Sequence, residues 1–274
     1  MTKESSCVGV VSGAMSRPLH VEHEAGGLTI LTLNRPEVRN AVDRRVVSEL
    51  KFQLDAFDAD DSRRVAILTG AGGNFSAGMD LKAYAAGQPP VRPSDRDYPS
   101  LMSPPRKPII AAVNGYAVAG GLEMALCCDL IVAGRDAKFG LPEIDRGLVA
   151  AGGGLMRLAR RIPHHVAMRL ALTGEQATAD EAAGWGLVSE VADGDALTAA
   201  RHLAYRLMQH PDRALAATKQ IVSASPDWPW AEAFERQRVL VDAVLASPDS
   251  LEGARAFIEH RAPGWVTKRS DQVC

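Results

Sequence analysis

The sequence lacks the features that mark several classes of protein. No run of apolar residues approaches the roughly 18 that a membrane-spanning helix needs. No block of Lys and Arg forms a basic patch, and the formal net charge is −2, so binding to nucleic acid or to an anionic membrane surface has no electrostatic support. The sequence therefore predicts neither a nucleic-acid partner nor a membrane partner.

Metal-binding and disulfide patterns are also missing. The four cysteines, Cys7, Cys127, Cys128 and Cys274, form no C-x-x-C pair, and the seven histidines lack the spacing of metal ligands. Cys127 and Cys128 are adjacent in an apolar stretch and are most simply buried thiols. We expect no metal site.

Nucleotide-binding signatures are absent as well. The stretch Gly70–Gly73 is rich in glycine, but it lacks the Gly-Lys-Ser/Thr ending of a P-loop. No G-x-G-x-x-G fingerprint opens a helix here. Nucleotide hydrolysis and dinucleotide binding are therefore disfavoured.

What is present is typical of a globular protein. Hydrophobic residues make up 46% and charged residues 23% of the 274 residues, which can bury a large core in one or two domains. The first sixteen residues contain only a weak apolar patch, residues 7–15, which Gly and Ser interrupt. We interpret residues 1–17 as a disordered tail rather than a signal peptide, and we expect the protein in the cytoplasm.

Hydrophobic periodicity predicts alternating strands and helices in the first half of the chain. Residues 19–24 and 28–34 alternate around Ala25-Gly26-Gly27, a hairpin pattern, and Asp43 suits the N-cap of a helix that reaches Phe57. A buried strand over residues 65–69 would follow in a parallel crossover. The other expected elements are strands over 108–113 and 187–191 and helices over 120–128, 155–161, 164–172, 178–181, 196–208, 214–223, 230–245 and 250–260. Residues 130–133 form a further apolar run.

Two glutamates stand alone in apolar surroundings. Glu123 follows Gly120-Gly121 at the start of an apolar helix, where backbone N–H groups without a helical partner point outward. Glu143 follows Leu141-Pro142 after a second apolar run. Two carboxyl groups in one dry pocket suit general acid/base catalysis, because burial and mutual repulsion push their pKa values apart. The simpler alternatives are a capping role for each glutamate and a close helix crossing for the Gly-Gly pair.

Four blocks of the sequence resemble the enoyl-CoA hydratase/isomerase (crotonase) superfamily. They are Leu33–Glu37 with Asn40-Ala41, Gly70–Asp80, Ala111–Glu123 and Phe139–Gly154, in the order and spacing of the family from about residue 19 to 262. The resemblance implies an α/β protein with the crotonase-like (ClpP/crotonase) spiral of β-β-α repeats. It implies a core domain with the active site over residues 18–195 and a C-terminal helical oligomerisation region over residues 196–274.

The same resemblance implies roles for individual residues. The backbone N–H groups of Met79 and Gly120 would form an oxyanion hole for the oxygen of a substrate thioester. Glu123 would hold and activate a water molecule, and Glu143 would deliver a proton to the α carbon, with the roles reversed for dehydration. Further residues expected to contact the substrate or its coenzyme A tail are Arg39, Ala77, Gly78, Asp80, Lys82 and Gly121.

Retention of both glutamates bears on the reaction, because isomerase-like members usually keep only the one at the Glu143 position. The resemblance therefore implies an enoyl-CoA hydratase, a lyase that adds water syn and reversibly to a 2-enoyl-CoA in fatty-acid catabolism (β-oxidation) or a related pathway. It needs no cofactor, since coenzyme A is part of the substrate. Ala150 stands where a Pro is usual, which leaves the acyl specificity open. The alternatives on the same scaffold are an isomerase and a specialised dehydratase similar to carnitinyl-CoA dehydratase, whose members also keep both acids. A non-catalytic acyl-CoA-binding relative is the alternative of another class.

Three further expectations concern the substrate and the assembly. Residues 86–106 are rich in Pro, Gly, Asp and Arg, and they either shape the acyl pocket or form a simple surface insertion. Arg39 and Lys82 are the best candidates to hold the phosphates of coenzyme A, although each could equally be a solvated surface charge. The resemblance implies a homotrimer or a homohexamer formed as a dimer of trimers.

Overall fold

The computed structural model describes residues 17–90 and 104–266. The predicted tail over residues 1–17 thus lies outside the described residues except for Arg17, as does the central part of the 86–106 segment. Within the described ranges no helix is long and apolar enough to cross a membrane.

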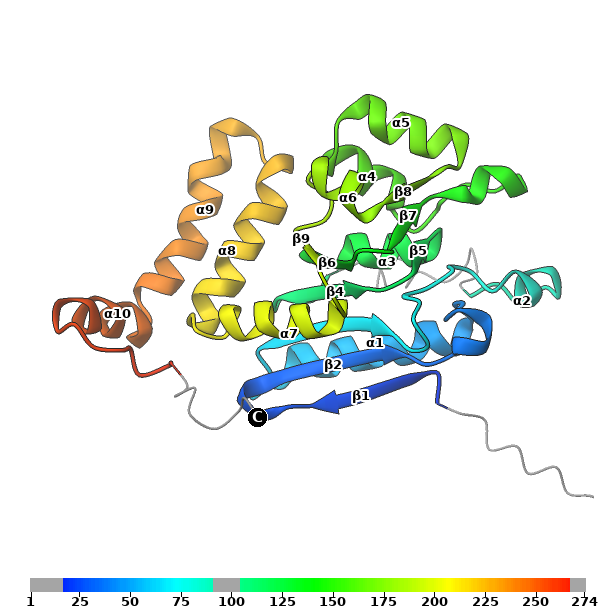
Figure 1. Ribbon diagram of the computed structural model, residues 1–274. Helices are drawn as coiled ribbons and strands as arrows, with labels where there is room; N and C mark the ends of the chain where they lie inside the picture. Colours follow the sequence, from blue (N-terminus) through cyan, green and yellow to red (C-terminus); the bar gives the residue numbers. More distant parts are fainter. Residues whose placement is uncertain (1–16, 91–103, 267–274) are drawn as a thin grey trace, which may run out of the picture.

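A six-stranded sheet forms the centre of the fold (Figure 1). Only its first two strands are antiparallel to each other, and every other neighbouring pair is parallel. The hairpin predicted around Ala25-Gly26-Gly27 is confirmed, as is the parallel pairing of the strands on either side of the first helix. In spatial order the strands are β1 (Leu19–His23), β2 (Leu28–Leu33), β3 (Val65–Gly70), β4 (Ile109–Val113), β6 (Leu130–Gly134) and β9 (Glu190–Ala192).

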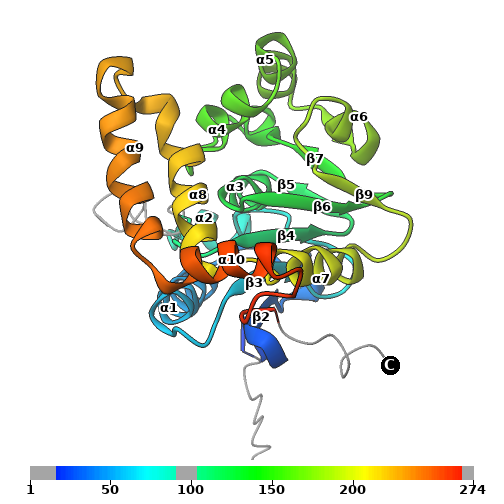
Figure 2. The same ribbon diagram turned by 90° about the vertical axis from the view of Figure 1, so that its left-hand side faces the viewer.

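The inner strands β3, β4 and β6 are buried on both faces, which explains their continuous apolar runs. In β4, Ile109, Ala111 and Val113 point into one hydrophobic cluster, and Ile110 and Ala112 point into another on the opposite face. The first cluster includes α1 (Arg44–Ala59) and α3 (Gly120–Cys127), and the second includes α7 (Ala196–Leu207). Figure 2 shows α7 running along the sheet.

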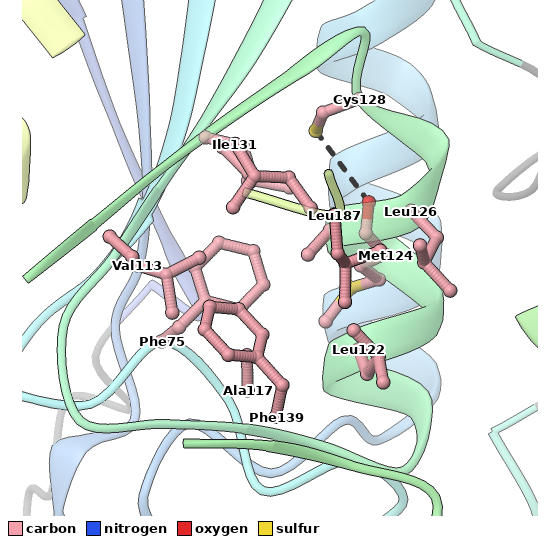
Figure 3. Packing of buried hydrophobic residues seen from close by; sticks show 14 of the residues in the cluster. Phe75, Val113, Ala117, Leu122, Met124, Leu126, Cys128, Ile131, Phe139 and Leu187 are labelled. Carbon is pink, nitrogen blue, oxygen red and sulfur yellow. Dashed lines mark hydrogen bonds between the residues drawn. The ribbon is translucent and has the colours of Figure 1, made fainter. Parts of the chain in front are cut away.

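Helix α3 lies over the larger cluster. Six of its eight residues are buried, and Leu122, Met124 and Leu126 belong to the same cluster as Val113 of β4 and Ile131 of β6 (Figure 3). Cys128, just after the helix, is buried, and its Sγ lies 3.6 Å from the Met124 carbonyl oxygen. Cys127 is half-buried, and neither cysteine is joined in a disulfide.

A second, three-stranded sheet was not predicted. It consists of β5 (Tyr116–Val118), β7 (Lys138–Gly140) and β8 (Gln176–Thr178). Each strand has only three residues, too few for a period-2 pattern to be recognised. The expectation that the chain is helical from Gly152 onward, apart from residues 187–191, is therefore wrong at β8, and the last strand begins at Glu190 rather than Leu187.

The remaining helices follow the predicted ranges closely. The capping box at Thr178 is confirmed, with reciprocal hydrogen bonds between Thr178 and Glu181. These helices are α4 (Gly154–Arg161), α5 (His164–Thr173), α6 (Ala179–Gly184), α8 (Asp212–Ala224), α9 (Trp230–Leu245) and α10 (Pro248–Ile258). Helix α2 (Leu81–Ala85) was not predicted, and short 3-10 turns lie at Ala25–Gly27, Pro36–Val38, Pro142–Arg146 and Ser225–Asp227.

The C-terminal helices extend away from the sheets. Figure 1 shows α8 and α9 beside the rest of the fold, and α9 has no buried residue. Helix α7 is different, because its alanines pack on the sheet and make it part of the core. The domain boundary predicted at residue 196 assigns this helix to the C-terminal region instead. Large apolar side chains exposed on α9 and α10 are Trp230, Phe234, Val239, Leu245, Leu251, Phe257 and Ile258.

Candidate active site

Glu123 is held at the junction of two helices. It occupies the first turn of α3, and its side chain is buried, with only 5% of the residue exposed. Its Oε1 accepts a hydrogen bond of 2.9 Å from the N–H of Gly154, the first residue of α4. The carboxyl group is therefore fixed by the start of a second helix, where a negative charge is favourable.

Glu143 reaches the same site from a different segment. It lies in the 3-10 turn Pro142–Arg146, directly after β7 and Leu141. Its side chain is half-buried, and within the described parts of the chain its buried Oε2 has no hydrogen-bond partner. An unpaired buried carboxyl oxygen is costly when ionised, so this geometry favours the protonated acid.

The pKa values of both glutamates lie above the usual range. Burial raises the pKa of Glu143 to about 7, and the nearby Glu123 carboxylate adds to the effect. Burial also raises the pKa of Glu123, but hydrogen bonds from the backbone N–H groups of Gly154 and Gly152 and the charge of Arg157 oppose this rise. Glu123 is therefore the better candidate for the ionised base and Glu143 for the acid.

The raised pKa of Glu143 predicts a dependence of stability on pH. Between about pH 4.5 and 7 the unfolded chain loses this proton while the folded protein keeps it, so the free energy of unfolding falls as the pH rises. Glu143→Gln removes this loss. Parallel thermal scans from pH 5 to pH 7.5 measure the melting temperature of the variant minus that of wild type. We expect this difference to increase with pH, and a difference that does not change with pH would contradict the assignment.

The oxyanion-hole donors predicted at Met79 and Gly120 lie next to each other. Gly120 begins α3, so its N–H has no partner within that helix. A Cβ built on Gly120 would lie 3.7 Å from the Met79 nitrogen and 3.9 Å from Glu123 Oε2. Met79 pairs with Val42 in an isolated parallel β-bridge, in which the Val42 N–H donates to Gly78 O and the Asp80 N–H donates to Val42 O. The intervening Met79 N–H therefore points to the opposite side.

One cavity of about 790 Å³ brings these groups together. Both glutamates, Met79 and Gly120 contribute to its wall. Of the further residues predicted to contact the substrate, four line it: Arg39, Ala77, Asp80 and Lys82.

The two other predicted contact residues, Gly78 and Gly121, are buried behind the cavity wall. A Cβ on Gly121 would lie 2.2 Å from the Ser76 carbonyl oxygen, so this glycine permits close packing of α3 on the 76–80 segment rather than contact with a ligand. A Cβ on Gly78 would lie 2.8 Å from the Gly120 nitrogen. Gly78 thus allows the two donor segments to approach each other, and substrate contact at Gly78 and Gly121 stays a prediction.

The two predicted cations differ in setting. Arg39 is exposed, and its guanidinium lies 5.5 Å from the centroid of the Tyr116 ring, which directs it along the cavity wall. Lys82 is exposed in the first turn of α2. Asp80 forms an ion pair of 3.0 Å with Arg35 and caps α2, so its carboxylate is engaged within the protein.

Sequence reasoning missed several residues of this cavity. Gln176 comes from the unpredicted strand β8, and no sequence signal marked it. The N–H of Gly154 as a partner of Glu123 was also missed, although a glycine cluster before an amphipathic helix is a signal for a helix N-terminus. Other lining residues that were not predicted are Tyr84, Tyr116, Met124, Asp145 and Arg146.

No group of three or more His, Cys, Asp or Glu side chains with metal-binding geometry occurs among residues 17–90 and 104–266. The cavity brings together two carboxyl groups, of Glu123 and Glu143, and two backbone donors, of Met79 and Gly120. Such a set can move protons on a carbon skeleton and stabilise negative charge on a carbonyl oxygen.

The sequence and the fold match known proteins over most of their length. Residues 23–268 match the Enoyl-CoA hydratase/isomerase family. A carnitinyl-CoA dehydratase of Salmonella typhi is 39% identical over 264 residues, which cover 92% of this chain and 99% of that protein. A solved enoyl-CoA hydratase from Mycobacterium tuberculosis H37Rv has a TM-score of 0.86 at 47% identity, covering 90% of this chain and 98% of that one. A solved carnitinyl-CoA hydratase from Mycobacterium avium has a TM-score of 0.72 at 35% identity, covering 91% and 98%.

Proposed function

The chain belongs to the enoyl-CoA hydratase/isomerase family, and on that premise we propose that it is an enoyl-CoA hydratase, a lyase that adds water reversibly and syn to a 2-enoyl-CoA to give a 3-hydroxyacyl-CoA. The observation that carries the proposal is the meeting of buried Glu123 and half-buried Glu143, from separate segments, with two backbone donors in one cavity. An isomerase would need only one of the two acids.

The backbone donors act on the thioester oxygen. When the oxygen of water attacks C3, the electrons of the double bond move toward the thioester carbonyl, whose oxygen becomes negative. The N–H groups of Met79 and Gly120 would each donate a hydrogen bond to that oxygen. A preorganised donor of this kind is worth about 3–4 kcal/mol of barrier.

The glutamates divide the proton transfers. Ionised Glu123 accepts a proton from the attacking water, and protonated Glu143 donates its proton to C2 on the same face. After one turnover Glu123 is protonated and Glu143 is ionised, and exchange with solvent restores the starting state. Dehydration runs the same steps in reverse. The pKa of about 7 at Glu143 supports its role as the acid.

This assignment predicts the pH dependence of the rate. The active enzyme carries one proton on the two carboxyl groups, so kcat/KM should follow a bell-shaped curve against pH. The same holds for hydration and for dehydration, because the reaction consumes no net proton. Above the Glu143 pKa of about 7, kcat/KM should fall about tenfold per pH unit. Initial rates with crotonyl-CoA from pH 5 to 9 test this expectation. A flat profile through pH 7 to 9 would rule out Glu143 as the acid.

A direct assay tests the reaction class. Loss of the conjugated thioester absorbance with crotonyl-CoA and longer 2-enoyl-CoAs would support the hydratase. Conversion of a 3-enoyl-CoA faster than hydration would identify an isomerase. A protein that binds these thioesters without turning any of them over would be the non-catalytic relative.

A specialised dehydratase is the second candidate, because the carnitinyl-CoA dehydratase of Salmonella typhi is 39% identical to this chain. Comparing kcat/KM for carnitinyl-CoA with that for 3-hydroxybutyryl-CoA separates the two candidates. The hydratase proposal expects the unsubstituted substrate to be preferred. A preference for carnitinyl-CoA would assign the chain to the specialised reaction on the same residues.

The proposal extends to binding, assembly and location. Arg39 and Lys82 at the cavity wall would hold the phosphates of coenzyme A. The exposed apolar residues of α9 and α10 support assembly as a homotrimer or homohexamer. The buried Cys128, which is in no disulfide, fits a reducing compartment, which supports a place in cytoplasmic fatty-acid or related acyl-CoA catabolism.

A further inference from the structure

Arg35 joins two segments that meet beside the cavity. Its guanidinium donates a hydrogen bond of 2.7 Å to the Ala41 carbonyl oxygen and forms an ion pair of 3.0 Å with Asp80. The same guanidinium lies 3.4 Å from the carboxylate of Asp43. Asp43 caps α1 and Asp80 caps α2, so one half-buried cation connects the starts of two helices.

A second set of polar contacts joins the same segments. Asn40 is 1% exposed and has a φ of 55°; its Oδ1 accepts the Arg35 N–H, and its Nδ2 donates to the carbonyl oxygens of Ala71 and Asn74. The Ser76 hydroxyl donates to the Asn40 carbonyl oxygen at 2.8 Å and accepts the Gly78 N–H at 3.1 Å. Residues 35–43 thus hold residues 76–80 at both ends.

The held segment contains the donor at Met79. The Val42 N–H donates to Gly78 O, and the Asp80 N–H donates to Val42 O, which leaves the Met79 N–H between them directed at the cavity. Arg35 contacts Asp80, the next residue after Met79, and Ala41, the residue before Val42. A shift of Asp80 relative to Val42 would rotate the Met79 peptide plane.

We propose that Arg35 is a positioning residue that sets the direction of the Met79 N–H toward the thioester oxygen. This inference rests on the proposed role of Met79 as an oxyanion donor. A guanidinium suits the task because its planar fork bonds the carbonyl and the carboxylate at once, whereas a lysine ammonium at this site would serve one of them. The geometry matters because a misplacement of about 1 Å can cost 10²-fold in rate.

Arg35→Met removes the charge and the contacts with Ala41, Asp80 and Asp43, and Arg35→Lys keeps the charge. Arg64→Met is a matched control: the Arg64 side chain has the same 13% exposure as that of Arg35, and it bonds the carboxylate of Asp212 and the carbonyl oxygens of Met208 and His210. Arg64 lies just before β3, at the end opposite the cavity. Both Met variants therefore lose a partly buried arginine with several hydrogen bonds, but only Arg35→Met loses one beside the cavity.

Three measurements follow each variant. We expect Arg35→Met to lower kcat about 10- to 100-fold and to change KM less than about threefold. Complete loss of an oxyanion donor lowers kcat about 10²–10³-fold, and a misplaced donor should cost less than that. The red shift of bound 4-dimethylaminocinnamoyl-CoA, which reports polarisation of the thioester carbonyl, should shrink in step with kcat. Arg35→Lys should lie between wild type and Arg35→Met. The upper limb of the pH profile should stay in place in all three proteins, since Glu143 is untouched.

Arg64→Met should lose thermal stability to a similar degree and keep both kcat and the red shift. The proposal is overturned if Arg35→Met keeps the wild-type red shift, or if Arg64→Met loses kcat and red shift equally. Amide hydrogen exchange of residues 76–80 tests the inference without turnover: Arg35→Met should exchange the protected Ala77, Gly78 and Asp80 amides faster. If wild type hydrates no 2-enoyl-CoA, the proposed function fails, while the exchange result still decides whether Arg35 holds this segment.

Discussion

Replacing Glu143 by Gln is expected to lower kcat for hydration by about 10²–10⁴, the contribution of a positioned general acid. Gln has nearly the same shape, but its amide cannot deliver a proton to C2. Because the side chain makes no hydrogen bond through the buried Oε2 within the described residues, the substitution breaks no contact there, and KM should change little. Steady-state rates with crotonyl-CoA measure the effect.

Glu123→Gln should cause a loss of similar size, because the attacking water then has no base. Its Oε1 can still accept the Gly154 N–H, so the start of α4 should stay in place. Glu190→Gln, at an exposed position of β9, is the matched control and should behave as wild type. If either active-site variant retains turnover near wild type, the acid/base assignment is wrong for that residue.

Gly78→Ala is expected to lower kcat about 10²–10³-fold, the usual cost of losing an oxyanion donor. The added Cβ would lie 2.7 Å from the Ala119 Cβ, 2.8 Å from the Gly120 nitrogen and 2.9 Å from the Val118 carbonyl oxygen. These are backbone or short side-chain atoms, so the donors of Gly120 and Met79 must move apart. Rates and coenzyme A thioester binding, measured together, separate this effect from loss of affinity.

Backbone strain alone gives a different result. Gly78 has a φ of 82° and Gly73 a φ of 76°, but a Cβ on Gly73 would meet nothing within 4 Å. Gly73→Ala therefore shares the strain, about 1–2 kcal/mol, without the collision. It should be less stable than wild type and equally active. Equal loss of activity in both variants would mean that strain in the loop, rather than the donor geometry, sets the rate.

The long elements could be predicted because their apolar periodicity is set by burial. The strands at β3 and β4 are buried on both faces, and the helices at α1 and α7 carry apolar residues at spacings of three and four. The sheet of β5, β7 and β8 could not be predicted, because its pairing joins residues distant in sequence and each strand is only three residues long. Such short strands owe their structure to tertiary contacts rather than to local sequence.

The candidate site was predictable where chemistry is carried by residue type. Glu123 and Glu143 stood out as carboxylates in apolar runs, and the glycines beside them marked close backbone approach. Arg35 was not distinguished from other surface cations, because its role depends on Ala41 and Asp80 meeting in the fold. The packing role of Gly78 and Gly121 was not predicted, because a glycine that allows backbone packing and one that faces a ligand look the same in a sequence.

The most direct test of the site is a crystal structure of Glu143→Gln with crotonyl-CoA. The account predicts the thioester oxygen about 3 Å from the backbone nitrogens of both Met79 and Gly120. It also predicts the C2–C3 double bond between the side chains of residues 123 and 143. A thioester oxygen bound to other groups, or a double bond distant from either side chain, would contradict it.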